Sequence, residues 1–120
     1  MKVKDLFKGN PATAVGTITE FGGPHDTKDN GMTVCGFSTI EHPNFKYCAL
    51  PIPVWEKYNL RCAQPVFFEH GASRVSGVLW DNGPTASLMR IADVLPIIMK
   101  ALGGDGRLNN VRVIIGGNQT

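Results

Sequence analysis

The sequence predicts a mainly β fold, a small barrel of short strands with one or two short helices. Its 14 glycines and 8 prolines interrupt the chain about every eight to twelve residues, which is typical of strands and turns rather than long helices. With 42% hydrophobic and 18% charged residues in a chain of 120, the composition suits one hydrophobic core. We expect a single domain over residues 1–120, with its core at about residues 12–116.

Strands are indicated by runs of β-branched and aromatic residues between the glycine and proline breaks. Several of these runs are apolar on both faces, as barrel strands often are near their ends. The predicted strands are Ala12 to Thr19, Val34 to Ser38, Pro65 to Glu69, Arg74 to Trp80 and Val111 to Ile115.

One segment carries the signals of a short helix. Asp93 provides an N-cap acceptor, VLPIIMKAL follows with Pro96 in the first turn, and Gly103 comes just after the end. We expect the apolar side of this helix to cover an opening of the barrel. A second, weaker helix is indicated within Leu50 to Asn59, where two prolines exclude helix before about Val54.

Charge and hydropathy exclude two classes of partner. The net charge is only +2, and no window combines clustered Lys and Arg with aromatic residues, so we expect no nucleic-acid binding. No apolar run reaches the roughly 20 residues that span a bilayer, and the opening MKVKDLFKGN lacks the apolar stretch of a secretory signal. We therefore expect cytoplasmic synthesis, and we leave open whether the protein is associated with a virus particle or acts in the periplasm or cell wall.

The cysteines and histidines do not indicate a metal site. Three cysteines, Cys35, Cys48 and Cys62, include no CxxC pair, and we favour buried thiols over one disulfide. The three histidines lie far apart and show no HExxH spacing. The sequence thus predicts neither a metal nor another cofactor.

The strongest candidate for chemistry is Asp81, within VSGVLWDNGP. A carboxylate at the end of a rigid strand, followed at once by a tight turn, is held in a fixed direction where a ligand can reach it. An alternative is that Asp81 only caps the turn through an Asx-type hydrogen bond. The residue pattern alone does not decide between these two roles.

A wider set of motifs extends this interpretation. The second half contains a D-x-G-P motif, an R-I-x-D motif and a helix that ends in leucine and glycine, and the first half contains shorter matches. In order they are Gly16 to Gly22, Cys35-Gly36, Ala49-Leu50-Pro51, Asp81-Asn82-Gly83-Pro84, Arg90-Ile91-Ala92-Asp93, Ala101-Leu102-Gly103, Gly106 and Val111 to Ile115. The chain resembles, through these motifs, the rare lipoprotein A, expansin and family-45 endoglucanase group. The resemblance implies a six-stranded double-psi β-barrel.

The resemblance also implies a function. Asp81 stands at the position of the essential acid of the lytic transglycosylases, which cleave peptidoglycan by donating a proton to the glycosidic oxygen. Such an acid needs burial or a nearby carboxylate, for which Glu20, Asp26 and Asp29 are candidates. In a hydrolase of the endoglucanase type, Asp26 is the second carboxyl group and His25 orients a hydroxyl or carboxylate.

Other roles remain open, because Glu20, Phe21, Trp80 and Asn82 depart from the group's usual residues. The alternatives are a non-catalytic, expansin-like module that binds polysaccharide and a structural barrel in a virion or another assembly. A bacteriophage origin is left open for the peptidoglycan-cleaving enzyme. For cell-wall polysaccharide we expect Asp81 and Asp26 to be catalytic. The expected substrate-binding residues are Glu20, Phe21, His25, Asn82, Tyr47 and Arg90.

Two further residues have structural expectations. Trp80 precedes Asp81 in a strand, so it should point to the opposite face and pack in the core. Asp93 is expected to act as a helix N-cap, with Arg90 paired either to it or to the substrate.

Overall fold

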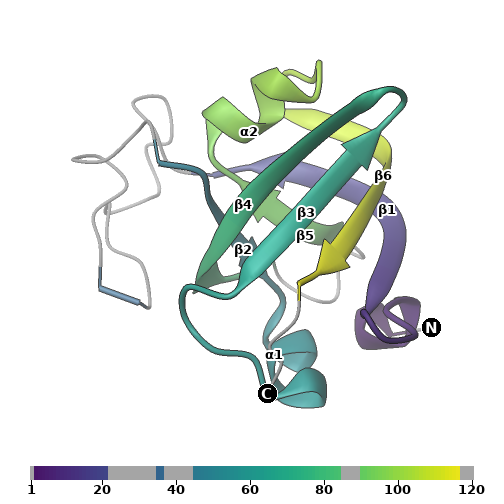
Figure 1. Ribbon diagram of the computed structural model, residues 1–120, viewed down its shortest axis with the longest axis vertical. Coiled ribbons are helices and arrows are strands. Elements are labelled where there is room, and N and C mark those ends of the chain that lie inside the picture. Colours follow the sequence, from purple (N-terminus) through teal and green to yellow (C-terminus); the bar gives the residue numbers. More distant parts are fainter. Residues whose placement is uncertain (1, 22–34, 37–44, 85–89, 117–120) are drawn as a thin grey trace.

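The chain forms a closed barrel of six strands with two short α-helices, as predicted (Figure 1). A computed structural model describes residues 2–21, 35–36, 45–84 and 90–116. The strands are β1 (Thr13–Glu20), β2 (Tyr47–Leu50), β3 (Pro65–His70), β4 (Ser73–Asn82), β5 (Arg90–Val94) and β6 (Arg107–Ile115). The helices are α1 (Ile52–Tyr58), α2 (Pro96–Ala101) and a short 3₁₀ turn, η1 (Val3–Leu6).

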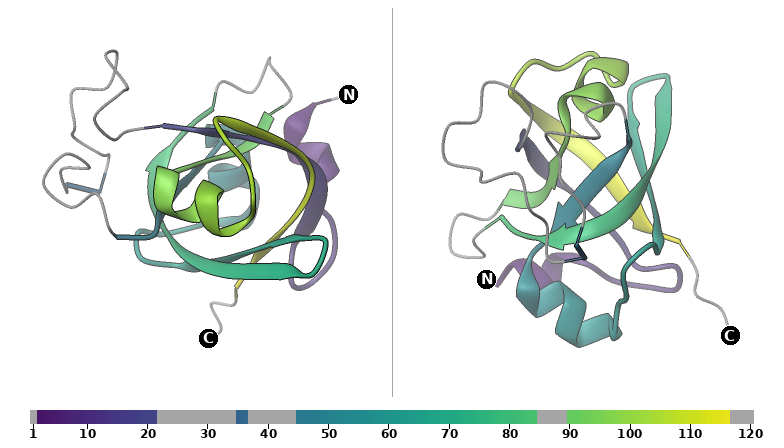
Figure 2. Two further views of the ribbon diagram at one scale, coloured as in Figure 1. Left: turned by 90° about the horizontal axis from the view of Figure 1, so that it is seen from above. Right: turned by 90° about the vertical axis from the view of Figure 1, so that its left-hand side faces the viewer.

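Around the barrel the strands follow the order β1-β5-β2-β4-β3-β6, and β6 closes onto β1. Two neighbouring pairs are parallel, β1 with β5 and β2 with β4, and the other four are antiparallel. Figure 2 shows the strands enclosing a single interior.

The barrel consists of two equivalent halves that interlock. The first half is β1, β2, α1 and β3, and the second is β4, β5, α2 and β6. Exchanging the halves turns β1 with β5 into β4 with β2, and β1 with β6 into β4 with β3, which are also observed pairs. The pairs β2 with β5 and β3 with β6 map onto themselves. The two parallel pairs are thus equivalent under the exchange of halves. This twofold pattern agrees with the predicted double-psi β-barrel.

The interior is filled by the alternate side chains of the strands, as small barrels require. The largest side chains that are fully buried come from all parts of the described chain: Phe7, Ile18, Leu50, Phe68, Leu79, Ile91, Leu95, Ile98 and Met99. Each such side chain stabilises the fold by about 1.5–3 kcal/mol relative to an exposed one. The acidic residues discussed below are therefore held by a closed, well-filled scaffold.

The two helices lie at opposite ends of the barrel (Figure 1). Helix α2 covers one opening, as expected, and buries Ile98 and Met99 (Figure 2). Helix α1 begins at Ile52, two residues before the predicted start, because Pro51 is its N-cap and Pro53 lies in the first turn. Proline is tolerated there, since the first amides of a helix have no intrahelical acceptor.

The strand predictions agree with the structure for β1, β3, β4 and β6 and miss two others. Strand β2 has only four residues, and β5 contains the residues that we assigned to a motif and a helix cap. Of the predicted strand Val34 to Ser38, Cys35 and Gly36 lie in a turn and bend rather than a strand, and the remainder is outside the described residues. None of the helices in the described ranges is long and apolar enough to cross a membrane.

Candidate functional site

Four residues from four neighbouring strands form one continuous row across the barrel wall. Thr19 of β1 pairs with Asp93 of β5, Asp93 pairs with Ala49 of β2, and Ala49 pairs with Asp81 of β4. We call Thr19, Asp93, Ala49 and Asp81 the acidic row. The row places two carboxyl groups on either side of one alanine.

The side chains of the acidic row point away from the barrel interior. Successive residues of a strand face opposite sides, and the residues directly before Thr19, Asp93 and Ala49 belong to the core: Ile18, Ala92 and Cys48. Leu79, two residues before Asp81, also belongs to the core and is separated from Asp81 by a bulge. None of the four row residues belongs to the hydrophobic core cluster. The two carboxyl groups therefore share the outer face.

A β-bulge in β4 directs Asp81 into the row. Cys48 pairs with Leu79 and the next residue, Ala49, pairs with Asp81, so Trp80 is an additional residue in β4. A bulge of this kind bends a strand and reorients the side chains beside it. Without the bulge, Ala49 would pair with Trp80, and Asp81 would pair with Leu50 and face the barrel interior.

Asp93 is part of this site and is not a helix cap, contrary to the prediction. It lies within β5, helix α2 has Leu95 as its N-cap residue, and no side chain caps that helix. The carboxylate Oδ1 of Asp93 accepts a hydrogen bond from the Thr19 hydroxyl. Its Oδ2 lies on the side of β4, 3.6 Å from the position that a Cβ atom on Gly83 would occupy.

Thr19 also connects Asp93 to a cation. The Arg90 Nη1 atom donates a hydrogen bond of 3.2 Å to the Thr19 Oγ1 atom. Thr19 is 8% exposed, and this contact is part-buried. Arg90 was predicted to pair with Asp93 or with substrate, and it reaches Asp93 through the Thr19 hydroxyl.

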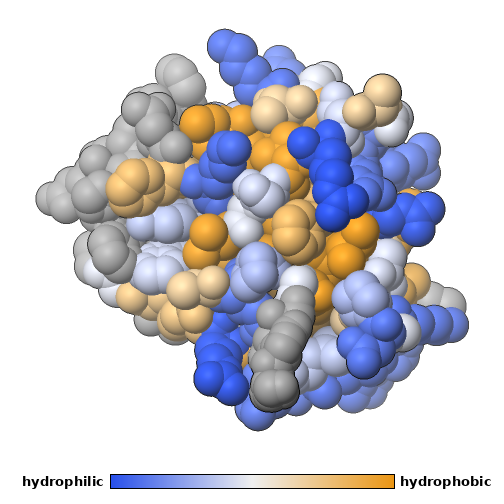
Figure 3. Space-filling model, viewed as in Figure 1, coloured by the Kyte–Doolittle hydropathy of each residue, from blue (hydrophilic) through white to orange (hydrophobic). Residues whose placement is uncertain are grey.

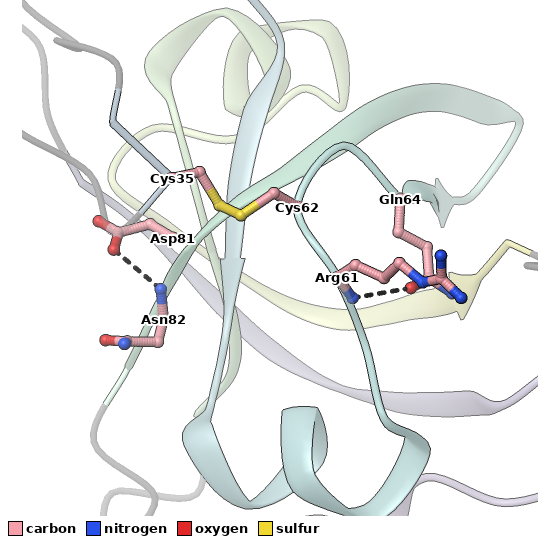
Figure 4. The surroundings of a disulfide bond; sticks show 6 residues. All are labelled: Cys35, Arg61, Cys62, Gln64, Asp81 and Asn82. Carbon is pink, nitrogen blue, oxygen red and sulfur yellow. Dashed lines mark hydrogen bonds between the residues drawn. A yellow bond between two sulfur atoms is a disulfide. The ribbon is translucent and has the colours of Figure 1, made fainter.

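Asp81 lies near the end of β4 and is half-buried. Its Oδ1 atom accepts a hydrogen bond of 2.9 Å from the Asn82 backbone amide (Figure 4). This bond is a local contact of the kind that the turn-capping alternative predicts. Asn82 is exposed beside it.

A disulfide lies next to this end of β4. Cys35 and Cys62 are bonded (Figure 4), and the Cys35 amide donates a hydrogen bond of 3.2 Å to the Trp80 carbonyl. Our expectation of three buried thiols was wrong for this pair, because the fold brings together two cysteines that are 27 residues apart in sequence. It holds for Cys48, which is buried and free.

An aromatic cluster flanks Asp81. Trp80 stacks on Tyr47 with ring centroids 5.1 Å apart, and Phe45 contacts the Tyr47 ring edge-on. Trp80 is half-buried on the outer face, so the prediction that it packs in the core was wrong. The bulge explains the error, because Trp80 follows the inward-facing Leu79 and keeps its outward direction.

Of the other predicted site residues, the structure describes Glu20 and Phe21 at the end of β1. Glu20 is close to the row but its Oε1 atom accepts a hydrogen bond from the Gly106 amide, and Phe21 bonds through its amide to the Val94 carbonyl. His25 and Asp26 lie outside the described residues. Within the described ranges no group of three metal-binding side chains occurs.

A second outer surface lies on β3, β4 and β6, as Figure 3 shows from the side of Figure 1. Glu69 forms ion pairs with Arg74 and Arg112, and the Arg74 guanidinium lies 4.9 Å from the centre of the Phe67 ring. Hydrophobic and charged groups therefore alternate on this face, and its described residues include no carboxyl pair like that of the acidic row.

Comparison with known proteins identifies the fold but no family. No family model matches the chain, and no curated protein matches it. A solved structure of the Streptomyces papain inhibitor is similar, with a TM-score of 0.61 and 16% identity, over 85% of this chain and 92% of that one. Membership of the rare lipoprotein A and expansin group stays a prediction. The chain thus has a barrel fold similar to that of the Streptomyces papain inhibitor.

Proposed function

We propose that this domain acts on a cell-wall polysaccharide, peptidoglycan in the first instance, through the carboxyl groups of Asp81 and Asp93. The observation that carries the proposal is their position in one outward-facing row with only Ala49 between them. Glycan-cleaving sites generally use a pair of carboxyl groups, one of which donates a proton to the glycosidic oxygen.

The spacing of the pair suits this chemistry. Neighbouring strands lie about 4.8 Å apart, so the Cα atoms of Asp81 and Asp93 are roughly 10 Å apart. Carboxyl groups about 6.5–9.5 Å apart leave room for a hydroxyl or water between them. Asp93 thereby takes the part that the sequence assigned to Asp26, and it does so from a rigid strand.

The negative charge of Asp93 on the other side of the ligand favours a proton on Asp81, because a like charge opposes the ionisation of a carboxyl group. In the proposed reaction Asp81 carries this proton and transfers it to the glycosidic oxygen as the bond to the anomeric carbon breaks. The substrate's own 6-hydroxyl then forms a bond to the anomeric carbon and releases its proton to the Asp93 carboxylate. The products are a free hydroxyl and a 1,6-anhydro sugar, which is the outcome of a lytic transglycosylase.

The second candidate is a non-catalytic barrel that binds another protein. It is favoured by the similarity to the Streptomyces papain inhibitor and by the mixed surface of Phe67, Arg74 and Arg112. Aromatic and arginine side chains are enriched at protein interfaces. A third candidate, the expansin-like module, would bind glycan through the same acidic row without turnover.

One assay with purified peptidoglycan and, in parallel, papain separates these candidates. Products with 1,6-anhydro ends, found by mass spectrometry, support the transglycosylase; reducing ends indicate that water is the nucleophile. Co-sedimentation with peptidoglycan without products supports the expansin-like module. Inhibition of papain without glycan binding would overturn the glycan proposal in favour of the protein-binding barrel.

A further inference from the structure

We propose that Arg90 is a positioning residue that acts through the Thr19 hydroxyl to keep Asp93 ionised and to confine any proton on Asp93 to Oδ2. The significance of this device for catalysis rests on the proposed function. The device itself is a property of three side chains and is measurable without any substrate.

The direction of the hydrogen bonds follows from the chemistry of the groups. A guanidinium can only donate, so the Thr19 oxygen must accept from Arg90. The hydroxyl has one proton of its own, which it donates to Oδ1 of Asp93. Because Oδ1 is an acceptor in this arrangement, a proton on Asp93 can reside only on Oδ2.

Arg90 has little else to bind. Its Nε atom is buried, and no acceptor for it exists among the described residues. The Thr19 hydroxyl is the side-chain acceptor that the described residues offer to this guanidinium. The cation is therefore committed to Thr19, and its charge acts on Asp93 through a polarised hydroxyl.

The charged groups around Asp93 favour the same state. Arg107 of β6 pairs with Thr19, on the far side from Asp93, and adds a second positive charge at that end. Of the opposite sign are Glu20 of β1, bonded to the Gly106 amide, and Asp81 of β4, beyond Ala49. Helix α2 contributes only the exposed Lys100.

The arrangement makes the two carboxyl groups unequal. Asp93 accepts a charge-assisted hydrogen bond at one end of the acidic row, which stabilises its ionised form. Asp81 lies at the other end, away from Arg90 and Arg107. In the proposed reaction the proton then resides on Asp81, and Oδ2 of Asp93, on the side of Gly83 and β4, is the oxygen that receives a proton.

Titration of the Asp93 carboxyl carbon by NMR tests this proposal in the wild type and four variants. Arg90→Gln and Thr19→Val should each raise the pH midpoint of Asp93 by about one unit, since an opposite charge and a donated hydrogen bond favour the ionised form by that order. Arg90→Lys keeps the charge and Thr19→Ser keeps the hydroxyl, so the Asp93 midpoint of each variant should lie close to that of the wild type.

The double variant Arg90→Gln/Thr19→Val shows whether Arg90 acts through Thr19. We expect the midpoint of Thr19→Val alone, because coupled residues are not additive. Additive shifts, or an unchanged midpoint in a folded Arg90→Gln protein, would overturn the proposal. If Arg90→Gln does not fold, equal midpoints in Thr19→Val and Thr19→Ser overturn it instead.

The outcome is independent of the proposed function. If the pH midpoints of Asp93 change as expected but the protein neither binds nor cleaves peptidoglycan, the proposed function is wrong and the positioning role of Arg90 holds. If the midpoints are unchanged but the protein cleaves peptidoglycan, the positioning role of Arg90 is wrong and the proposed function holds.

Discussion

At the scale of single residues, the acidic row depends on small side chains beside its two carboxyl groups. Ala49 separates Asp81 from Asp93 and carries only a methyl group. Gly83 leaves open the space next to Oδ2 of Asp93, and its φ of 130° is a conformation that other residues rarely adopt. The carboxyl groups are thus kept apart without being covered by the residues between them.

The Cys48 thiol provides a test at this scale. It is fully buried, and burial raises the pKa of this thiol far above its usual value. Because the thiolate is the reactive form, the native protein should not react with a thiol reagent at neutral pH. Mass spectrometry should show no adduct on the native protein and one adduct after unfolding without reductant.

Reduction before unfolding supplies the control for this experiment. Three adducts are then expected, because the Cys35 and Cys62 thiols become available. Rapid formation of a single adduct on native, oxidised protein would show that Cys48 is accessible and that the core is misplaced.

At the scale of elements, the twofold pattern makes Gly16 of β1 the counterpart of Gly77 of β4. A Cβ atom on Gly77 would lie 3.0 Å from the Lys46 carbonyl oxygen, which is backbone, and from the Ile98 side chain. The three atoms nearest to a Cβ atom on Gly16 all belong to the Ile91 side chain, and the closest lies at 3.0 Å. A side chain can rotate away more easily than a strand can move.

Alanine at these two positions should therefore have unequal effects. We expect Gly77→Ala to lower the free energy of unfolding by about 1–3 kcal/mol, as overpacking does, and Gly16→Ala to cost less. Urea denaturation of both variants measures the difference, with Ser76→Ala, at an exposed position of β4, as the control. A larger loss for Gly16→Ala would contradict the observed packing.

The disulfide is a further test at the element scale. It joins Cys35 to Cys62, which lies between α1 and β3, across 27 residues. Replacing both cysteines with serine should lower the stability by about 2–4 kcal/mol, since the unfolded chain loses a constraint. Thermal unfolding of the double variant checks this, and an unchanged melting temperature would mean that the bond does not constrain the chain.

The sequence predicted the elements with strong local signals and missed those fixed by pairing. β4 and α2 carry long apolar runs and turn residues, so they were found. β2 has only four residues, all buried, and becomes a strand because β4 and β5 lie on either side of it. A short apolar run of this kind has no periodicity that distinguishes it from a helix.

The site was partly predictable for a related reason. Asp81 was found because its strand and turn are local features. Asp93 was assigned to a helix cap, because aspartate before an apolar segment with proline is a common N-terminal signal. Its true neighbour, Thr19, is 74 residues away, and only the parallel pairing of β1 with β5 reveals it.

At the scale of the whole molecule, the barrel repeats one unit twice without a repeat in the sequence. The two halves share their strand order and pairing, but the row positions differ: Thr19 of β1 corresponds to Asp81 of β4, and Asp93 of β5 corresponds to Ala49 of β2. The scaffold is symmetric whereas the chemistry placed on it is not. This asymmetry is what a single site with two unequal carboxyl groups requires.

The central claim is that the acidic row cleaves glycan, and the rate of product release from peptidoglycan by carboxamide variants tests it most directly. Asp81→Asn and Asp93→Asn keep the shape of each side chain but remove the transferable proton or the charge, and Asp105→Asn changes an exposed acid outside the row. We predict a 10²- to 10⁴-fold lower rate for each row variant, the range of general acid–base catalysis, and a wild-type rate for Asp105→Asn. Cleavage by folded Asp81→Asn at the wild-type rate would contradict the account.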